Sequence, residues 1–468
     1  MADWIDRELA GCEFPDARLG KRFKTLVEQL SEGMGETIPT ACEDWANTKA
    51  AYRFLSNDRV SEADILSGHF QSTQKRFEGM PGLALVLHDT TEFTFKRDEP
   101  ESIGKIGVAI GHKDSTGRLH RPTVCGILMH SSLVVTPEGV PLGIAAIKFW
   151  TRQKFKGVRA LKKKINSTRV PIEEKESLRW LENLRQADAL LGDSDRCVHI
   201  GDRESDIFEL FDAAHETGTH FLFRIFVDRL AGDGNHTISE EIDQTDLKAL
   251  HVLEVRNAKG QLEKATLELR YRRIRIHPPV AKRNLYAPLT LTVIDAQEQE
   301  PPSDRVPIHW KLITDLPVST PLHAIEKLNW YAMRWKIETF HKILKSGCKA
   351  EESRLRSADR LVNLIAIFCI LSWRIFWMTM VHRSSDNAPA STVFTDIERQ
   401  LLDRLRPDKH KVPQSEKSLS YYIIKLARLG GYLARANDPP PGNIVIWRGF
   451  QKLMDIAVAF AFIKNVGN

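Results

Sequence analysis

Apolar residues recur at three- and four-residue intervals through the first part of the chain, a period that predicts amphipathic helices from residue 1 to about 75. Asp16 precedes the clearest of these helices as a capping residue. A second helix is expected over about 41–55, and a third opens at Ser61, which begins a capping-box pattern. The chain therefore starts with a compact helical unit.

The pattern changes near residue 80, where short apolar runs alternate with polar segments. Runs of this length, bounded by turn residues, are typical of buried strands. Helices are expected from Pro171 and from about Glu204. Strands that alternate with helices indicate a mixed α/β core. The strands are expected over 83–88, 123–135, 141–149, 197–200 and 221–227.

A β-rich stretch follows from about 228 to 315. The run from Thr266 to Tyr271 alternates with period two, and 289–294 and 308–314 are further strand candidates. A helix then begins near Leu322. The sequence thus predicts an all-β insertion within the α/β core, ahead of its last acidic helix.

The stretch from Leu361 to Val381 is the most hydrophobic of the chain, but Arg374 interrupts it after about a dozen residues, fewer than the ~20 that span a bilayer. We expect a buried core helix there and no membrane partner. Helical patterns then predict a C-terminal helical unit whose apolar faces suit subunit contacts. These patterns lie near 396–405, 419–433 and 447–462.

The expected organisation therefore has four parts. A helical unit (1–75) precedes an α/β core (76–227 and 316–382), which is interrupted by the β insertion (228–315) and followed by the C-terminal helical unit (383–468).

Composition bears on the cellular compartment of the protein and on the class of its partner. The 468 residues carry a net charge of +6 and a pI of about 8.9, which permits nucleic-acid binding without establishing it. The six cysteines form no C-x-x-C pair and no zinc-like cluster with histidine, as in a reduced cytosolic protein. The first residues lack the basic and apolar stretches of a signal peptide, so we expect a cytoplasmic location.

The most informative segment runs from Tyr331 through Arg334 and Glu338 to Lys345. The last three residues follow the first by three, seven and fourteen positions, a spacing that predicts one stripe along a single helix. A carboxylate can hold a divalent metal, whereas Arg, Lys and Tyr suit a phosphate backbone. The stripe indicates metal-dependent chemistry on a nucleic-acid phosphodiester.

Two further acids follow apolar strands. Asp89 comes after the run at 83–88, and Asp202 comes after the run at 197–200. With Glu338, these carboxylates can converge at a sheet edge and bind two divalent ions, for which Mg²⁺ is the preferred hard-oxygen partner and Mn²⁺ a substitute. Taken singly, an aspartate after a strand is more commonly a turn former or a helix cap.

In combination, these segments resemble the insertion-sequence-four family of bacterial DDE transposases, the group that includes the transposase of transposon five. The family signature Y-x(2)-R-x(3)-E-x(6)-K is matched without a gap by the segment that starts at Tyr331. The aspartate segments are matched by His88-Asp89-Thr90-Thr91 and by Asp202-Arg203-Glu204-Ser205-Asp206. The stretches Ala51-Tyr52-Arg53-Phe54 and Ala427-Arg428-Leu429-Gly430-Gly431 also look like family segments.

The resemblance implies an RNase H-like catalytic core with a β insertion, an N-terminal DNA-binding domain and a C-terminal dimerisation domain. Asp89, Asp202 and Glu338 would be the metal ligands, and Tyr331, Arg334 and Lys345 would grip phosphates near the cleaved end. The other DNA contacts that it implies are Trp310, which would stack on a flipped base, Trp335, which is placed to share that role, and Arg224, Arg18 and Arg22. For Trp310, core packing is the alternative.

A basic run extends from Lys148 to Arg169 and contains no acid. Such a run is usually a solvated charged surface. In a chain whose other motifs indicate DNA binding, the run favours phosphate contacts.

The preferred hypothesis is a cut-and-paste DNA transposase that nicks the transposon end, forms and resolves a hairpin, and transfers the strand to target DNA. Its expected partners are double-stranded DNA, as terminal inverted repeats and target, and a second copy of the chain in a synaptic homodimer. Its expected location is the bacterial cytoplasm, on the nucleoid. An RNase H-like nuclease and an inactive DNA-binding inhibitor remain as alternatives.

Overall fold

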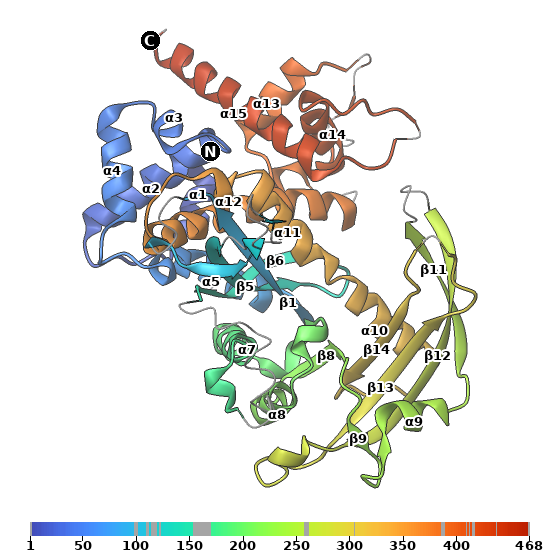
Figure 1. Cartoon of the computed structure of the whole chain (residues 1–468). Helices are drawn as coiled ribbons and strands as arrows, with labels where there is room; N and C mark the ends of the chain where they lie inside the picture. The colour runs from blue at the N-terminus through green and yellow to red at the C-terminus, as the bar shows by residue number, and fades with distance from the viewer. Residues whose placement is uncertain are drawn as a thin grey trace.

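The computed structural model describes residues 2–97, 102–108, 112–113, 119–120, 123–152, 170–256, 262–303, 305–384, 389–408, 410, 412–413, 417–436 and 438–466. Figure 1 shows a central sheet with the N-terminal helices at its upper left and the C-terminal helices above it. A β-rich extension reaches to the lower right.

The N-terminal unit is helical, as expected. Asp16 caps the second helix by accepting a hydrogen bond from the backbone N–H of Arg18 at 2.9 Å, and Ser61 forms a capping box with Asp64. The helix expected over 41–55 is instead two helices, because Glu43 adopts a φ of 63° between them. The helices are α1 (Ala2–Leu9), α2 (Ala17–Glu32), α3 (Ile38–Cys42), α4 (Trp45–Leu55) and α5 (Glu62–Glu78).

A buried polar link fixes this unit to the core. The Glu8 carboxylate of α1 lies 2.5 Å from Nδ1 of His69 on α5, and Nε2 of His69 accepts a hydrogen bond from the Ile144 N–H at 3.0 Å. Arg76 pairs with the same carboxylate at 3.0 Å. Because Nε2 accepts and burial lowers the pKa of His69, the ring is neutral and its Nδ1–H donates to Glu8.

The core sheet matches the strands expected from the apolar runs. Strand β1 pairs antiparallel with β5 and parallel with β7, and β7 pairs parallel with β8. Strands β2 and β6 both pair with β5, and β3 with β4 forms a separate small ladder. The bounds are β1 (Ala84–Phe95), β2 (Lys105–Val108), β3 (His112–Lys113), β4 (Leu119–His120), β5 (Thr123–Val135), β6 (Pro141–Trp150), β7 (Cys197–Gly201) and β8 (His220–Arg224).

Helices cover both faces of this sheet. Leu85 and Leu87 of β1 share one core with helices α11 (Trp335–Ser346) and α12 (Ala358–Ser384). Ala84 and Val86 point the other way and pack with α7 (Leu178–Leu191). Two helices begin later than expected, because short 3₁₀ turns follow Pro171 and Asp202, and α8 covers Phe208–Thr217.

The stretch at 228–315 continues the core sheet, since β14 pairs antiparallel with β8. It is β-rich but not all-β. A capping box between Thr237 and Glu240 begins a short helix, α9 (Ile238–Asp243). The strands are β9 (Leu230–Ala231), β10 (His236–Thr237), β11 (Ala249–Arg256), β12 (Leu262–Ile276), β13 (Leu289–Glu298) and β14 (His309–Thr314).

The remaining helices follow the insertion. Within the described residues, one helix, α12, is long and apolar enough to cross a membrane, and 94% of its most apolar window is buried inside the protein. It is a core helix, as its sequence predicted. The others are α10 (Pro321–Ala332), α13 (Asp396–Leu405), α14 (Leu419–Leu429) and α15 (Asn443–Val466).

Candidate active site

The four signature residues lie on two helices, so the prediction of a single helix is wrong. Tyr331 lies in the last turn of α10, Arg334 lies in the joining turn, and Glu338 and Lys345 lie in the first and last turns of α11. The turn tightens because the N–H of Arg334 bonds to the Tyr331 carbonyl, three residues back, at 3.0 Å. Tyr331 therefore faces the core at 5% exposure and packs edge-on against Trp310, with ring centroids 5.4 Å apart.

The two aspartates lie at the same level of neighbouring parallel strands. Pairing between β1 and β7 ends with Leu87 opposite Ile200, and Asp89 and Asp202 each come two residues later. Residues in register on parallel strands point to the same face, so Asp89 continues on β1 the face that α11 covers. Asp202 lies one residue beyond the end of β7, where it caps a 3₁₀ turn, and it does not line the cleft that Asp89 shares with Glu338. Asp89 was expected after its strand but lies within it, paired with Ser131 of β5, because β1 runs on to Phe95.

Helix α11 brings Glu338 to this face, and Arg334 joins it to Asp89. The guanidinium of Arg334 lies 3.7 Å from Oδ1 of Asp89 and forms an ion pair with Glu338. Burial opposes the charged form of Arg334, but the charges of Glu338 and Asp89 outweigh it and raise its pKa. Arg334 is thus a fixed cation between two carboxylates.

Two more side chains of α11 complete the site. Nδ1 of His341 lies 3.6 Å from Oδ2 of Asp89, and its Nε2 shares a 2.8 Å hydrogen bond with Ser131. Lys345 lies 3.9 Å from Glu351. Together these groups border an open cleft of about 310 Å³ that is lined by Asp89, Thr90, Thr91, Glu338, His341, Lys342, Lys345 and Ser346.

Asp202 sits beside a cation that the sequence did not single out. Its Oδ1 accepts a hydrogen bond from the Glu204 N–H at 2.9 Å. Glu204 forms an ion pair with the buried Arg179 of α7, which also donates to Thr90 at 3.2 Å. Nothing in the amphipathic pattern of α7 marks Arg179. His341 had a detectable signal, since it follows Glu338 by three positions on one helix.

Asp206, the last acid of the Asp202 segment, has a structural place. Its Oδ2 accepts hydrogen bonds from the N–H groups of Phe226 and Val227 at 2.7 and 2.6 Å, and the carboxylate pairs with Arg229. It holds the chain that leaves β8.

Buried histidines fix β1 from behind the site. His88 shares hydrogen bonds with His199 of β7 at 2.7 Å and with Ser132 of β5 at 2.9 Å. Nε2 of His199 shares another with Asp188 of α7 at 2.9 Å. Burial, with the nearby His199 and His130, holds the pKa of His88 well below its usual range, so this network is uncharged at His88. It ties the strand that carries Asp89 to both of its neighbours.

The carboxylates suit a divalent cation, although among the residues that the structure describes no three His, Cys, Asp or Glu side chains are close enough to hold one as they stand. A cation, the Arg334 guanidinium, already lies between Asp89 and Glu338. Glu338 is about half exposed, and its carboxylate is held by Arg334. Carboxylate oxygens are the donors that Mg²⁺ prefers.

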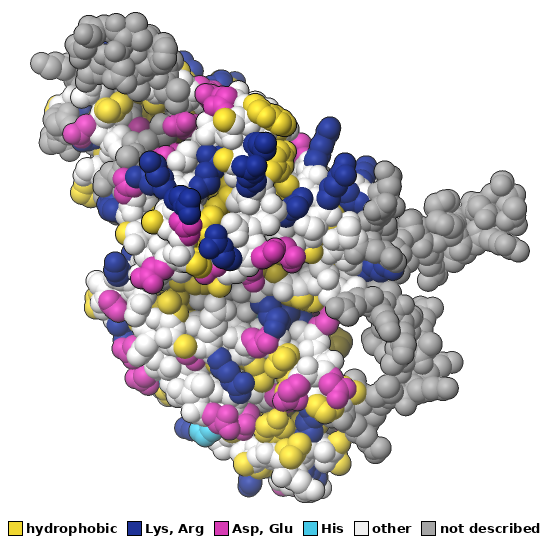
Figure 2. Space-filling view, turned by 90° about the vertical axis from the view of Figure 1, so that its left-hand side faces the viewer, with side chains coloured by type: hydrophobic (Ala, Val, Ile, Leu, Met, Phe, Trp, Pro, Cys, Tyr) yellow, Lys and Arg dark blue, Asp and Glu magenta, His cyan; other side chains and the backbone are white. Residues whose placement is uncertain are grey.

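The expected DNA contacts lie in different surroundings. Trp335 is 43% exposed on α11, and Arg224 donates to the His309 carbonyl at 2.7 Å. Arg18 pairs with its own capping residue, whereas Arg22 donates to Asn47 at 3.0 Å and so joins α2 to α4. Figure 2 faces the side where Figure 1 places α2 and α4, and Lys and Arg side chains gather in its upper half.

The basic run at 148–169 is described only at its start. Lys148 pairs with Glu182, and Arg152 pairs with Glu176. Residues 153–169 lie outside the described residues, so the expected phosphate contacts there stay a prediction.

Comparison with protein families gives two matches. Residues 1–60 match the family model described as transposase DNA-binding, and residues 175–373 match the model described as transposase DDE domain. The second match includes Asp202 and Glu338, and Asp89 lies ahead of it. The large mixed sheet flanked by helical N- and C-terminal regions is consistent with a DDE nuclease fold. The chain therefore carries a transposase DNA-binding domain followed by a DDE transposase domain, which together support a DNA transposase of the DDE class.

Proposed function

We propose that this chain is a cut-and-paste transposase of the insertion-sequence-four type, which nicks a transposon end, forms and opens a hairpin and joins the free 3′-end to target DNA. One observation carries the proposal: Asp89 of β1 shares a cleft with Glu338 of α11, and Asp202 follows directly after β7, the parallel neighbour of β1. Three carboxylates near one edge of a sheet suit in-line displacement at phosphorus.

We assign Asp89, Asp202 and Glu338 as ligands of two Mg²⁺ ions, which Mn²⁺ can replace. When bound, these ions supply Lewis-acid activation of the attacking and leaving oxygens. Arg334 holds Asp89 and Glu338 together in this structure, and with ions bound its guanidinium would suit a phosphate oxygen instead. His341, whose Nε2 is held by Ser131, lies beside Asp89 and orients it.

The remaining groups position the DNA. Lys345 lies at the end of the carboxylate cleft and is suited to a phosphate oxygen. Trp335 is 43% exposed, so its ring is suited to stacking on an unpaired base. Trp310, half-buried against Tyr331, offers a second aromatic surface. Tyr331 acts by supporting Trp310, because its ring is buried. Arg224 and Arg18 supply further phosphate contacts, whereas Arg22 braces the helical unit.

We assign one role to each of the proposed domains. Residues 1–75 bind the terminal repeats, the core at 76–227 and 316–382 performs the chemistry, the β-rich segment at 228–315 extends it along the DNA, and 383–468 dimerises. The expected site of action is the bacterial nucleoid, in the cytoplasm.

A strand-transfer assay separates this function from that of an RNase H-like nuclease. Pre-cut duplexes that end in the inverted repeats flanking the gene are incubated with a supercoiled plasmid and Mg²⁺. A transposase joins their 3′-ends to the plasmid, whereas a nuclease only nicks it. Repeat binding without any cleavage or joining would instead identify an inhibitory relative.

A further inference from the structure

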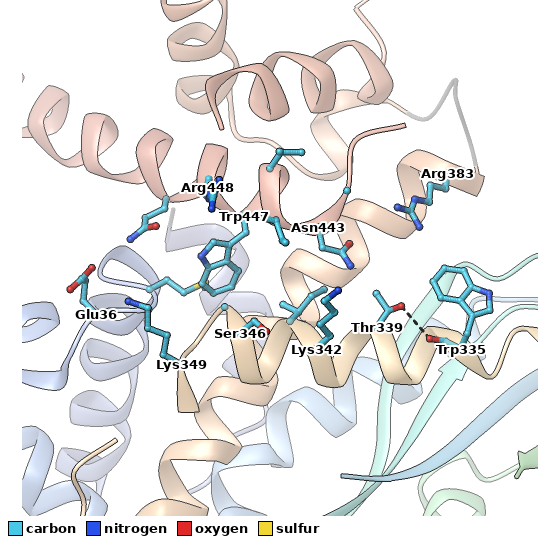
Figure 3. A pocket seen from close by; sticks show the side chains of 18 residues that line it. Glu36, Trp335, Thr339, Lys342, Ser346, Lys349, Arg383, Asn443, Trp447 and Arg448 are labelled. Atoms are coloured by element: carbon cyan, nitrogen blue, oxygen red, sulfur yellow. Dashed lines mark hydrogen bonds between the residues drawn. The ribbon is translucent and has the colours of Figure 1, made fainter. Parts of the chain in front are cut away.

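A second cleft lies across α11 from the carboxylates. It has a volume of about 730 Å³ and lies between α11, the loop at Gly35 and Glu36, and the start of α15 (Figure 3). Lys342 and Ser346 line both this α11–α15 cleft and the carboxylate cleft. The two clefts therefore adjoin on the surface of α11.

The lining of the α11–α15 cleft is mainly positively charged. Its lining includes four cations and one acid, Glu36; the cations are Lys342, Lys349, Arg383 and Arg448. Within the described parts of the chain, none of these four cations forms an ion pair or a side-chain hydrogen bond. Cations elsewhere on the core do have partners, such as Lys148 with Glu182. Like charges that face one hollow repel each other, so an anion bound there would stabilise the arrangement.

The same cleft also presents apolar and aromatic surface. Trp335, 43% exposed, lies at one end and Trp447 lies toward the other, as Figure 3 shows. Trp447 is held in place by Gly347, where a Cβ would lie 2.7 Å from the indole. Ile444 is 55% exposed on the rim. Aromatic and aliphatic groups between cations suit a polymer that carries both phosphates and bases.

The start of α15 adds to the attraction for anions. Asn443 is the first residue of this helix, so its free N–H groups and the positive end of its dipole lie at the cleft.

We infer that the α11–α15 cleft binds a stretch of DNA that continues over α11 from the strand held at the carboxylates. The inference rests on the proposed function and extends it, because it gives α15 a direct role in holding DNA. DNA fits better than a small anion because the cations come from three helices and the loop after α11, and because the cleft adjoins the carboxylate cleft. The occupant is the phosphate backbone and its bases, independent of sequence.

Photocrosslinking tests the occupant. The full chain carrying p-benzoylphenylalanine at Ile444 is irradiated with a labelled 40-base-pair duplex of the flanking inverted repeat. The matched control carries the same group at Leu433, which is 61% exposed in the same C-terminal region but does not line the cleft. We expect crosslinks to DNA from position 444 and none from position 433. A crosslink from 444 to a second protein copy, or no crosslink to DNA, would overturn the inference.

Salt dependence tests the charges. The double variant Lys349→Gln/Arg448→Gln is compared with Arg435→Gln, an exposed C-terminal arginine outside the cleft. Each phosphate contact contributes about 0.7 to 0.9 to the slope of log affinity against log salt, so we expect the double variant to lower the slope by about 1.4 to 1.8. Arg435→Gln should leave it unchanged. An unchanged slope in the double variant contradicts the assignment.

These readouts do not depend on catalysis. If crosslinks form at 444 but the protein neither cleaves nor joins DNA, the inference that the cleft binds DNA stands and the proposed function fails. If cleavage requires the three acids but 444 does not reach DNA, the proposed function stands and the cleft inference fails.

Discussion

Replacing Asp206 by alanine should destabilise the chain that leaves β8. The carboxylate is 2% exposed, accepts two backbone hydrogen bonds and pairs with Arg229, which is 7% exposed. Hydrogen bonds to a charged group contribute about 1.5–3 kcal/mol each, and removing one partner of a buried ion pair costs about 3–5 kcal/mol. Because one carboxylate makes all of these contacts, the costs overlap, and we expect a total of about 3–5 kcal/mol.

Hydrogen exchange localises this effect. In Asp206→Ala, the backbone amides of residues 225–229 should exchange much faster than in the wild type, and the urea midpoint should fall. The matched control is Asp202→Asn, because asparagine caps a helix about as well as aspartate and the hydrogen bond to Glu204 survives. That variant should keep wild-type stability while losing cleavage. Unchanged exchange and an unchanged midpoint in Asp206→Ala would refute the structural role of this acid.

Three other perturbations have definite expected outcomes. Burial favours the neutral form of Glu8, but His69 and Arg76 lower its pKa to about 2, so its contribution to stability is present above its ordinary value near 4.5 and is lost as the pH falls toward 2. Glu8→Gln should remove that part of the pH dependence of the urea midpoint, and an identical acid profile would contradict it. Gly430→Ala and Gly449→Ala each place a Cβ 1.9 Å from a carbonyl oxygen of the facing helix, so thermal unfolding should show a loss of about 1–3 kcal/mol, unlike Gly107→Ala, whose Cβ meets nothing within 4 Å. Trp310→Ala should bind the terminal repeat normally in a gel-shift assay yet form hairpins about 10- to 100-fold more slowly, since stacking on a base contributes about 1–3 kcal/mol; an unchanged rate would assign Trp310 to packing alone.

The strands were predictable because alternate residues pack on opposite faces of the sheet. Leu85 and Leu87 lie in one core and Ala84 and Val86 in another, so a strand buried on both faces appears in the sequence as a continuous apolar run. The sequence also contained the signal that Asp89 lies within its strand, since threonines and alternate phenylalanines continue the pattern to residue 95.

The break between α10 and α11, which interrupts the helix expected through Tyr331 and Glu338, was not predictable from local pattern. The chain tightens at Arg334, where the guanidinium reaches Asp89 from a distant part of the sequence. No helical period encodes such a contact. Arg179 was missed for the same reason, because only the fold brings α7 beside the Asp202 segment.

One C-terminal glycine was noticed in the sequence, but its structural role could not be predicted from it. Gly430 was singled out only by resemblance, and its physical role became visible in the structure: α14 and α15 approach so closely that no side chain fits between them. Proximity of this kind is set by two elements together.

A cleavage assay with isosteric variants decides whether the three acids form one metal-dependent site. Duplexes of the inverted repeats flanking the gene are labelled at the cleaved strand and incubated with wild type, Asp89→Asn, Asp202→Asn and Glu338→Gln, in Mg²⁺, Mn²⁺ or chelator. We predict that the wild type cleaves only with a metal ion, and that each variant retains repeat binding but loses cleavage by at least about 1000-fold, in line with the loss of a group that acts as part of one catalytic unit. Metal-dependent cleavage that persists in any one of the three variants would contradict the assignment.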